Sequence, residues 1–334
     1  MTRDPVIVMV FDRMDDRPAV VGIPTFLHTP QLHTPEDLQR ERPHVCIVGA
    51  PTDTAVTHRP GARFGPRAIR AASNLRRVAH HLDLHVQPFK LLRVFDYGDA
   101  NVVPGDIERT NEAIRTKVGE VARAGAVPVV LGGDHSITYP SASAVAEAVG
   151  RGKLGIVHFD AHADTAPDAW GVPLSHGTPM RRLIESGAVP GRNFVQVGLR
   201  GWWPPPDVFD WMREQGMRWH TIYDIQRRGF ETVLAEAIEQ ALDGPDRCYL
   251  SVDIDVLDPA FAPGTGTPEP GGLAARELLT AVREVALRTH LAALDVVEVS
   301  PPYDTSDITA EVAHRVVMEV LSSLAAKQSN NSPP

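Results

Sequence analysis

The chain has 334 residues, of which 43% are hydrophobic, so it is long enough for one large α/β domain or two smaller ones. Its formal net charge of −9 argues against nucleic acid and against an acidic membrane surface as partners, and it suits a cationic substrate. The apolar run at residues 6–11 is too short to span a membrane and precedes charged residues instead of a cleavage site, so we expect a cytoplasmic protein.

Residues 1–43 contain proline, histidine and mixed charge without a clear period, and we interpret them as an N-terminal arm that packs on a neighbouring subunit. From residue 44 onward, strand-like runs alternate with helical stretches. Strands are expected near 44–50, 91–96, 127–131, 154–159, 193–198, 218–223, 248–254 and 291–298. Helices are expected at 66–76, 107–125, 139–149, 178–187, 207–215, 230–242, 274–288 and 309–326. The polar end, residues 327–334, is expected to be disordered.

This alternation, with apolar strands that are buried on both sides, predicts a parallel sheet covered by helices on both faces. No linker or composition shift divides residues 44–326, which we interpret as a single doubly wound domain. Cys46 and Cys248 lie in two interior strands, so buried free thiols are favoured over a disulfide. In such folds ligands bind beyond the carboxyl ends of the strands, and the chemistry is expected there.

Aspartate and histidine side chains follow three of the predicted strands. The six side chains concerned are His135, Asp160, His162, Asp164, Asp253 and Asp255. Alternate residues of an extended segment point the same way, so the three that follow residue 159 and the pair at 253 and 255 are each expected to converge. A solvated polar loop is the alternative for any one segment, but the recurrence after three strands favours a metal site.

Six ligands exceed what one tetrahedral zinc ion needs, and they suit two divalent ions that share bridging carboxylates. Four carboxylates balance the charge of two divalent cations, whereas a single ion would leave buried carboxylates uncompensated. The oxygen-rich set favours Mn²⁺ over metals that prefer thiolates, and Ni²⁺ or Co²⁺ would also fit. We therefore expect two Mn²⁺ ions per subunit.

Three segments around these residues resemble the signature motifs of the ureohydrolase family, which comprises arginase, agmatinase and related guanidino-group hydrolases. They are residues 132–138, 160–164 and 251–272, and residues 61–67 and 298–304 are similar to further family segments. The resemblance implies a three-layer α/β/α sandwich around an eight-stranded parallel sheet, in agreement with the eight strands counted above. It also implies a homo-oligomer, trimeric or hexameric, and a small guanidino substrate.

The resemblance implies a role for each metal ligand. Asp160 and Asp253 would bridge the two metal ions. The other ligands would divide between the two sites in pairs, His135 with Asp164 and His162 with Asp255.

The resemblance also assigns the catalytic groups, which would hydrolyse a guanidinium to urea and an amine. His176 matches the active-site histidine that protonates the departing amine, and an imidazole titrating near neutrality suits that role. Glu298 matches the carboxylate that holds the guanidinium. Asp255 would help to stabilise the tetrahedral adduct.

Other polar residues near these motifs are interpreted as structural. His158 precedes the end of its strand and is expected to lie in the core or to support a ligand, not to bind metal. Asp134 and Asp258 are expected to orient loops or ligands. A cluster of three histidines is expected on the polar surface: His80, His81 and His85.

The segment between Asp164 and His176 lacks the serine and asparagine residues with which arginase-like enzymes hold an α-amino acid, which argues against L-arginine. Four residues are expected to line the mouth of the pocket: Asp168, Trp170, Trp202 and Trp203. Aromatic faces accept an ammonium group by cation–π contact, worth roughly 0.5–2 kcal/mol. Agmatine, yielding putrescine and urea, is therefore the expected substrate.

Other substrates and other classes stay open at this point. The tryptophans could instead fill the pocket and leave room only for free guanidine, and a guanidino acid such as 4-guanidinobutyrate is also possible. A single-zinc deacetylase or an inactive metal-binding subunit would be a protein of another class. The completeness of the six-residue ligand set speaks against both.

Overall fold

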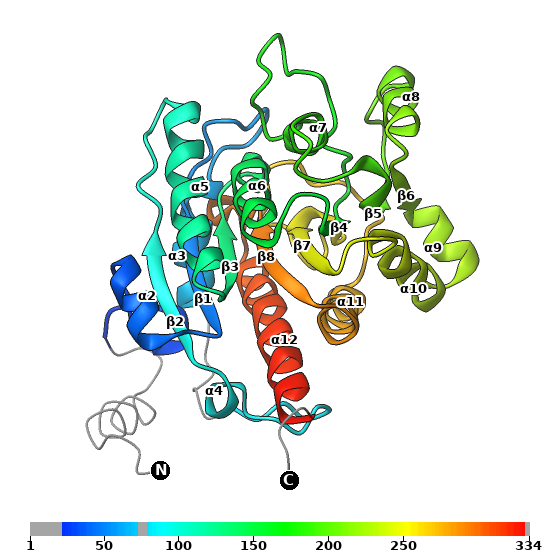
Figure 1. The fold of residues 1–334 in the computed structure, drawn as a ribbon. Coiled ribbons are helices and arrows are strands. Elements are labelled where there is room, and N and C mark those ends of the chain that lie inside the picture. Colours follow the sequence, from blue (N-terminus) through cyan, green and yellow to red (C-terminus); the bar gives the residue numbers. More distant parts are fainter. Residues whose placement is uncertain (1–21, 73–78, 331–334) are drawn as a thin grey trace, which may run out of the picture.

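The computed structural model describes residues 22–72 and 79–330, and at its centre lies an eight-stranded sheet (Figure 1). The strands are β1 Val45–Ala50, β2 Val94–Asp99, β3 Val127–Gly132, β4 Leu154–Phe159, β5 Phe194–Leu199, β6 Arg218–Thr221, β7 Arg247–Asp253 and β8 Leu291–Val297. Their order across the sheet is β2-β1-β3-β8-β7-β4-β5-β6, and all neighbouring strands are parallel. The predicted eight-stranded parallel sheet is confirmed.

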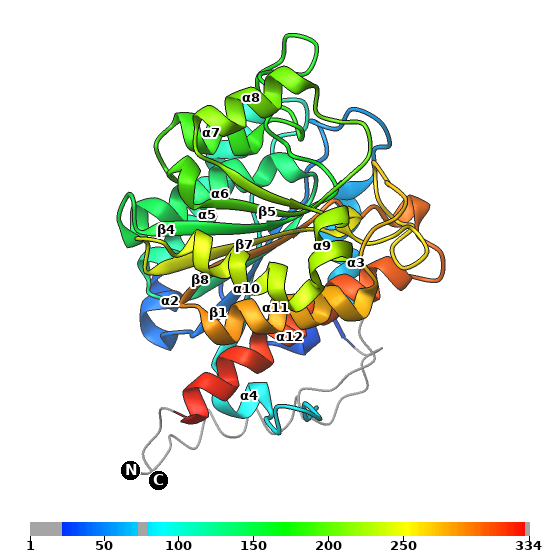
Figure 2. The same cartoon turned by 90° about the vertical axis from the view of Figure 1, so that its right-hand side faces the viewer.

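Helices cover both faces of the sheet, as Figure 2 shows. The sheet divides the hydrophobic core into two halves, one on each face. One half packs under α5 Ile107–Arg123, α6 Thr138–Val149, α7 Pro179–Glu185 and α8 Pro206–Glu214. The other packs under α3 Gly65–Ala71, α10 Phe230–Ala241, α11 Ala275–Arg288 and α12 Ile308–Asn330. The other α-helices of the described residues are short: α2 Pro35–Glu41, α4 Pro88–Leu91 and α9 Ile222–Arg228. The predicted three-layer α/β/α sandwich is therefore confirmed.

The side chains of the central strands alternate between the two core halves. In β4, Leu154 and Ile156 face the half under α5–α8, whereas Val157 and Phe159 face the half under α10–α12. Both sides of the strand are buried, so apolar residues are needed at successive positions. Gly155 lies where α10 approaches closely, because a Cβ atom there would be 2.0 Å from a backbone oxygen of that helix.

Several predicted elements have different ends in the structure. The strand predicted near 91–96 lies at Val94–Asp99. The strand predicted at 218–223 ends at Thr221, which forms a capping box with Asp224 and starts α9, a helix that the sequence pattern did not indicate. The helix predicted at 66–76 corresponds to α3, which ends at Ala71. Residues 73–76 of that prediction lie outside the described residues.

The C-terminal helix is longer than predicted. The tail was expected to be disordered from residue 327, but α12 continues to Asn330. Lys327 explains the difference, because its ammonium group donates hydrogen bonds to the carbonyl oxygens of Ala286 and Thr289 at the end of α11. Over the described ranges, no helix combines the length and apolar composition needed to cross a membrane.

Residues 22–43 of the predicted N-terminal arm pack on this chain's own edge strand, β2. The backbone N–H groups of Phe26 and Leu32 donate to the side chain and the carbonyl of Asp96, at 3.1 and 3.0 Å. Two nitrogens of Arg70 in α3 donate to the same carboxylate, at 2.8 and 2.9 Å. This ion pair is buried and joins the arm, α3 and the sheet edge. Residues 1–21 of the arm lie outside the described part.

Replacing Arg70 with methionine should lower the free energy of unfolding by about 3–5 kcal/mol, because the Asp96 carboxylate would stay buried without its partner. Urea denaturation would measure the loss. Arg213→Met is the matched control, since Arg213 pairs with Asp210 on the exposed surface of α8 and should contribute little. Equal effects of the two variants would contradict the role given to the buried pair.

Candidate metal centre and active site

Polar side chains gather at the carboxyl ends of four neighbouring strands, β3, β8, β7 and β4. His135 lies in the 3₁₀ turn after β3, Glu298 directly follows β8, and Asp253 ends β7. The other predicted ligands lie in the loop after β4 and the turn after β7: Asp160, His162, Asp164 and Asp255. The sheet therefore joins residues far apart in sequence, such as His135 and Glu298, which are 163 positions apart.

The ligands converge through turns and not through the strand alternation predicted from the sequence. β4 ends at Phe159, so the residues after it do not continue the strand. Asp164 has a φ angle of +52°, in the left-handed region that non-glycine residues seldom adopt. After β7, the carboxylate of Asp253 accepts a hydrogen bond from the backbone N–H of Asp255 at 2.8 Å and starts a 3₁₀ turn. These two turns replace the predicted extended segments.

The six predicted ligands form two groups that share Asp160. The first group contains His135, Asp160, Asp164 and Asp253, and the second contains Asp160, His162 and Asp255. In the first, the Nδ1 atom of His135 lies 3.0–3.1 Å from one oxygen of each carboxylate. In the second, the Nδ1 atom of His162 lies 3.1 Å from Asp255 and 3.5 Å from Asp160. The atoms of each group lie within 4.8 Å of one another, which allows a single ion to contact all of them.

The tautomer of His135 leaves its Nδ1 atom facing the carboxylates. The hydroxyl of Ser251 donates to Asp295 at 2.7 Å, so it accepts from the Nε2–H group of His135 at 3.0 Å. The Nδ1 atom has no hydrogen-bond partner. Only a positive charge is stable at this point, either a proton or a metal ion, and the oxygen-rich donor set fits a divalent cation.

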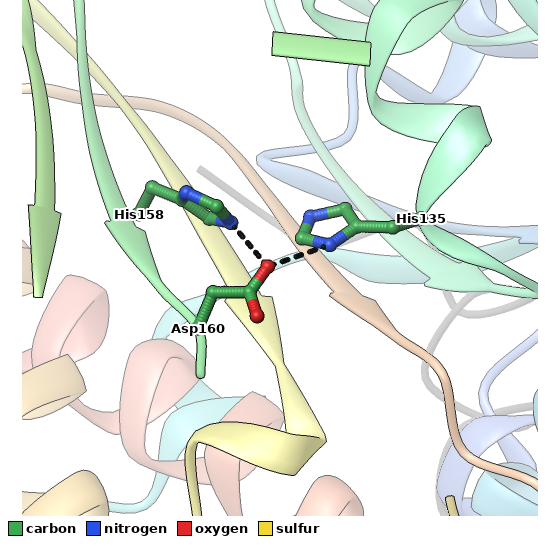
Figure 3. A group of neighbouring side chains, drawn as sticks. All are labelled: His135, His158 and Asp160. Carbon is green, nitrogen blue, oxygen red and sulfur yellow. Dashed lines mark ion pairs between the residues drawn. The ribbon is translucent and has the colours of Figure 1, made fainter. Parts of the chain in front are cut away.

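His158 lies beside Asp160 and completes a third group of possible ligands with His135 (Figure 3). The side-chain NH₂ of Gln196 donates to the carbonyl of Ala163 at 2.6 Å, and the same nitrogen donates to the Nδ1 atom of His158 at 3.0 Å. The Nε2 atom of His158 therefore carries the proton, and it lies 2.9 Å from Asp160. A protonated nitrogen cannot bind a metal, so this geometry agrees with the supporting role predicted for His158.

Glu298 and His176 contact each other next to the metal ligands. One oxygen of Glu298 accepts from the backbone N–H of His135 at 2.8 Å and lies 2.9 Å from the Nδ1 atom of His176. The other oxygen of Glu298 is buried and has no hydrogen-bond partner. Burial lowers the pKa of His176, but the Glu298 carboxylate outweighs it and raises the pKa to about 9. This arrangement leaves one carboxylate oxygen free for a cationic group.

A cavity of about 590 Å³ adjoins this site and is lined in part by the ligands His162, Asp164 and Asp253. Three predicted tail residues also line it: Asp168, Trp170 and Trp203. The two tryptophans are 86% and 53% exposed, so they lie at the rim and do not fill the cavity. The structure does not bring Trp202 to the cavity, because its side chain is 98% exposed and is not among the lining residues.

Four hydroxyl residues of the cavity were missed by the sequence analysis: Thr57, Ser175, Thr178 and Thr267. Thr267 donates to Asp255 at 3.2 Å, and the hydroxyl of Thr57 lies 2.7 Å from the Nε2 atom of His176. Thr267 falls inside a segment that resembles a family motif, and Ser175 and Thr178 lie within two residues of His176, which was the one available signal. Thr57 precedes such a segment and carries no signal of its own.

Asp134 and Asp258 orient loops, as predicted. Asp134 accepts from the backbone N–H of Ala55 at 3.1 Å and so holds the loop that carries Thr57. Burial raises the pKa of Asp134 to about 6. Asp258 accepts from two backbone N–H groups of its own loop, at 2.9 and 2.7 Å. Of the three clustered histidines, His80 and His85 are exposed, whereas His81 is partly buried and lies 3.1 Å from Glu319 of α12.

The sheet order, the two ligand groups that share a carboxylate and the adjoining cavity fit a dinuclear metallohydrolase centre on an α/β/α sandwich. The chain belongs to the arginase family, which it matches over residues 43–322. It is 43% identical to guanidinopropionase from Pseudomonas aeruginosa, over 92% of this chain and 93% of that protein. It is 39% identical to a mitochondrial agmatinase from Gallus gallus, over 90% of this chain and 85% of that protein.

Solved structures agree with the sequence comparison. Proclavaminate amidinohydrolase from Streptomyces clavuligerus superimposes with a TM-score of 0.83 and 38% identity, over 93% of this chain and 99% of that chain. Enzymes of the arginase family hydrolyse guanidino compounds and depend on a dinuclear metal centre, so this chain is a guanidino-group amidinohydrolase.

Metal removal should make the stability of the protein fall as pH rises. Burial opposes protonation of His135 and His162, but the carboxylates raise both pKa values well above 6.5. Their stabilising contribution is therefore complete below about pH 6.5 and is lost as the pH rises through the raised values. Burial also raises the pKa values of Asp253 and Asp255, so their ionisation acts in the same direction.

Bound divalent cations would reverse the effects of the histidines and of the aspartates on the pH dependence of stability. We expect the difference in Tm between Mn²⁺-loaded and EDTA-treated protein to grow from about pH 6 to about pH 8.5. Differential scanning fluorimetry at matched ionic strength would measure it. A difference that shrinks over this range would contradict a cation site at these carboxylates.

Proposed function

We propose that the substrate is agmatine, which the enzyme hydrolyses to putrescine and urea. The chemistry of the cavity rim carries this proposal. Asp168 and the indoles of Trp170 and Trp203 line the cavity, and among the described residues neither lysine nor arginine lines it. A protonated amine can pair with the carboxylate and lie on the aromatic faces, whereas a carboxylate tail would find no cationic partner.

We propose that two divalent cations bind, Mn²⁺ in preference to Ni²⁺ or Co²⁺, with Asp160 and Asp253 as bridging ligands. The position of Asp160 in both ligand groups supports its bridging role. The remaining ligands pair as His135 with Asp164 and His162 with Asp255. When bound, such a pair of cations lowers the pKa of a water molecule toward neutrality and so supplies a hydroxide nucleophile.

Glu298 would bind the guanidinium through its free oxygen. Its other oxygen is fixed by the backbone N–H of His135 at 2.8 Å, so the carboxylate is oriented before the substrate arrives. Its backbone has a φ angle of +61°, an unfavourable conformation of the kind that occurs at functional sites. A charge-assisted contact there would place the guanidinium carbon beside the metal ligands.

His176 would protonate the departing nitrogen, and Asp255 would stabilise the tetrahedral adduct. The neighbouring Glu298 raises the pKa of His176 to about 9 against the effect of burial, which keeps the imidazole protonated at neutral pH. The hydroxyl of Thr267 donates to Asp255 at 3.2 Å and orients that carboxylate.

We also propose that the enzyme is a cytoplasmic homo-oligomer, a trimer or a hexamer. Cys46 and Cys248 are buried free thiols, which is typical of a reducing compartment. The oligomeric state rests on the resemblance to the family alone.

A guanidino acid is the second candidate substrate. The relative that is 43% identical is named guanidinopropionase, and a compound of that class has a carboxylate in place of the amine of agmatine. Trp170 and Trp203 are exposed, which favours a position at the rim of the cavity over one that fills it. Free guanidine is therefore the weaker alternative.

Urea release across a panel of guanidines would test the substrate. We expect the highest kcat/KM with agmatine, and activity on L-arginine lower by about two orders of magnitude, since an unpaired buried carboxylate costs several kcal/mol. Asp168→Asn should raise the KM for agmatine roughly fivefold, as expected for an exposed ion pair worth about 1 kcal/mol. Asp210→Asn on the exposed face of α8 is the matched control. Faster hydrolysis of 3-guanidinopropionate than of agmatine would instead favour the guanidino acid.

Replacing His176 with asparagine should lower kcat by about 10²–10⁴-fold, the usual contribution of a general acid. Metal content, measured by atomic absorption, should stay at the wild-type value, because the His176 ring contacts Glu298 and Thr57 and belongs to neither ligand group. Loss of metal together with activity would show that His176 is a ligand and would overturn its role as the acid.

A further inference from the structure

Neither ring nitrogen of His176 is free to reach a substrate. The Nδ1 atom lies 2.9 Å from Glu298, and the Nε2 atom lies 2.7 Å from the hydroxyl of Thr57 and 3.1 Å from its backbone nitrogen. His176 is mostly buried and lines the cavity, but these contacts occupy both of its ring nitrogens. The groups that hold the ring therefore offer the shortest path for a proton that leaves His176.

We propose that the hydroxyl of Thr57 relays the proton from His176 to the departing amine nitrogen. The relay rests on the role of His176 as proton donor, which is part of the proposed function. Thr57 is an exposed residue that lines the cavity, so its hydroxyl can contact both the His176 ring and a bound substrate.

The two groups of Thr57 that face the ring have different chemistry. A backbone N–H can only donate, so it stabilises the neutral ring and opposes a proton on the Nε2 atom. A hydroxyl can donate or accept, so it can serve the ring in both protonation states. Thr57 thus favours the transfer of the proton out of the ring and offers the route for it.

Glu298 is a poorer route for the same proton. Its oxygen beside His176 already accepts from the backbone N–H of His135 at 2.8 Å. A proton on this carboxylate would also remove the negative charge that holds the guanidinium. The carboxylate therefore keeps the Nδ1–H group in place while the Nε2 side of the ring gives up its proton.

The proton balance of the step is complete. The Nε2–H bond of the imidazolium breaks, and this proton forms a new O–H bond at Thr57. At the same time the original hydroxyl proton of Thr57 forms an N–H bond with the departing nitrogen, as the bond from that nitrogen to the adduct carbon breaks. The ring ends neutral, and Thr57 again carries one hydroxyl proton.

The loop that carries Thr57 is fixed to the segment that carries His176. The carbonyl of Ala55 accepts from the backbone N–H of His176 at 3.2 Å and from the hydroxyl of Ser175 at 3.2 Å. The backbone N–H of Ala55 donates to Asp134 at 3.1 Å. These contacts lie two residues from Thr57 and hold its hydroxyl at hydrogen-bond distance from the ring.

The test compares Thr57→Val, which removes the hydroxyl and keeps the shape, with Thr57→Ser, which keeps the hydroxyl. We expect kcat for agmatine, or for the best guanidine of the panel, to fall about 10- to 100-fold in Thr57→Val. Thr57→Ser should stay within about threefold of the wild type. Thr54→Val on the same loop is the matched control, because Thr54 is exposed and does not line the cavity. Metal content and circular dichroism would confirm that each variant is folded and loaded.

A solvent isotope measurement separates a relay from a structural role. In mixtures of H₂O and D₂O, the single-turnover rate of the wild type should depend on the deuterium fraction with the curvature of two protons moving together. Thr57→Val should lose this curvature. Equal losses in Thr57→Ser and Thr57→Val, or a curved dependence that survives in Thr57→Val, would overturn the relay.

The outcomes also separate the relay from the function on which it rests. If His176→Asn is impaired and Thr57→Val is not, His176 stays the acid and the relay is wrong. If His176→Asn keeps the wild-type rate, the assignment of His176 fails, and the relay fails with it.

Discussion

Mutual repulsion among four buried aspartates, Asp160, Asp164, Asp253 and Asp255, is the constraint on which the rest of the site depends. Burial and the neighbouring carboxylates raise the pKa of Asp253 well above its usual value, whereas hydrogen-bonding histidines outweigh burial and lower the pKa of Asp160. A protein keeps such a cluster only where cations neutralise it. Asp160 lies at its centre, since it belongs to all three groups of possible ligands, and the surrounding loops serve to hold its neighbours at the same point.

Two imidazoles near this cluster are each oriented by an uncharged partner. Ser251 fixes His135, and Gln196 fixes His158. In each case a neutral hydrogen-bonding group decides which ring nitrogen carries a proton. The ring nitrogen of His135 that faces the carboxylates is thereby left for a cation, whereas that of His158 carries a proton. Two histidines in contact with the same carboxylate thus have opposite roles, and the difference comes from residues further out.

The sequence predicted the sheet and the identity of the candidate ligands more accurately than it predicted the local backbone geometry around them. Apolar runs such as 154–159 are buried on both faces, and this leaves a strong signal in composition. The turns after β4 and β7 left no such signal. Asp164 has a left-handed backbone, which composition does not indicate, and its carboxylate lies beside His135, which follows a different strand. Helix α9 was missed because Thr221 and Asp224 make a short capping box inside an apparent strand. Thr57 was missed because its contact with His176 joins residues 119 positions apart. Long-range contacts of this kind cannot be read from periodicity.

The position of β8 in the sheet has a consequence for how the protein forms in the cell. It is the last of the described strands, yet it lies between β3 and β7 in the middle of the sheet. Until residues 291–297 leave the ribosome, β3 and β7 each expose an unpaired edge, and the two halves of the ligand set are not held together. The nascent chain is therefore open to edge-to-edge association through most of its synthesis, and closure of the sheet and assembly of the metal centre become a single late event.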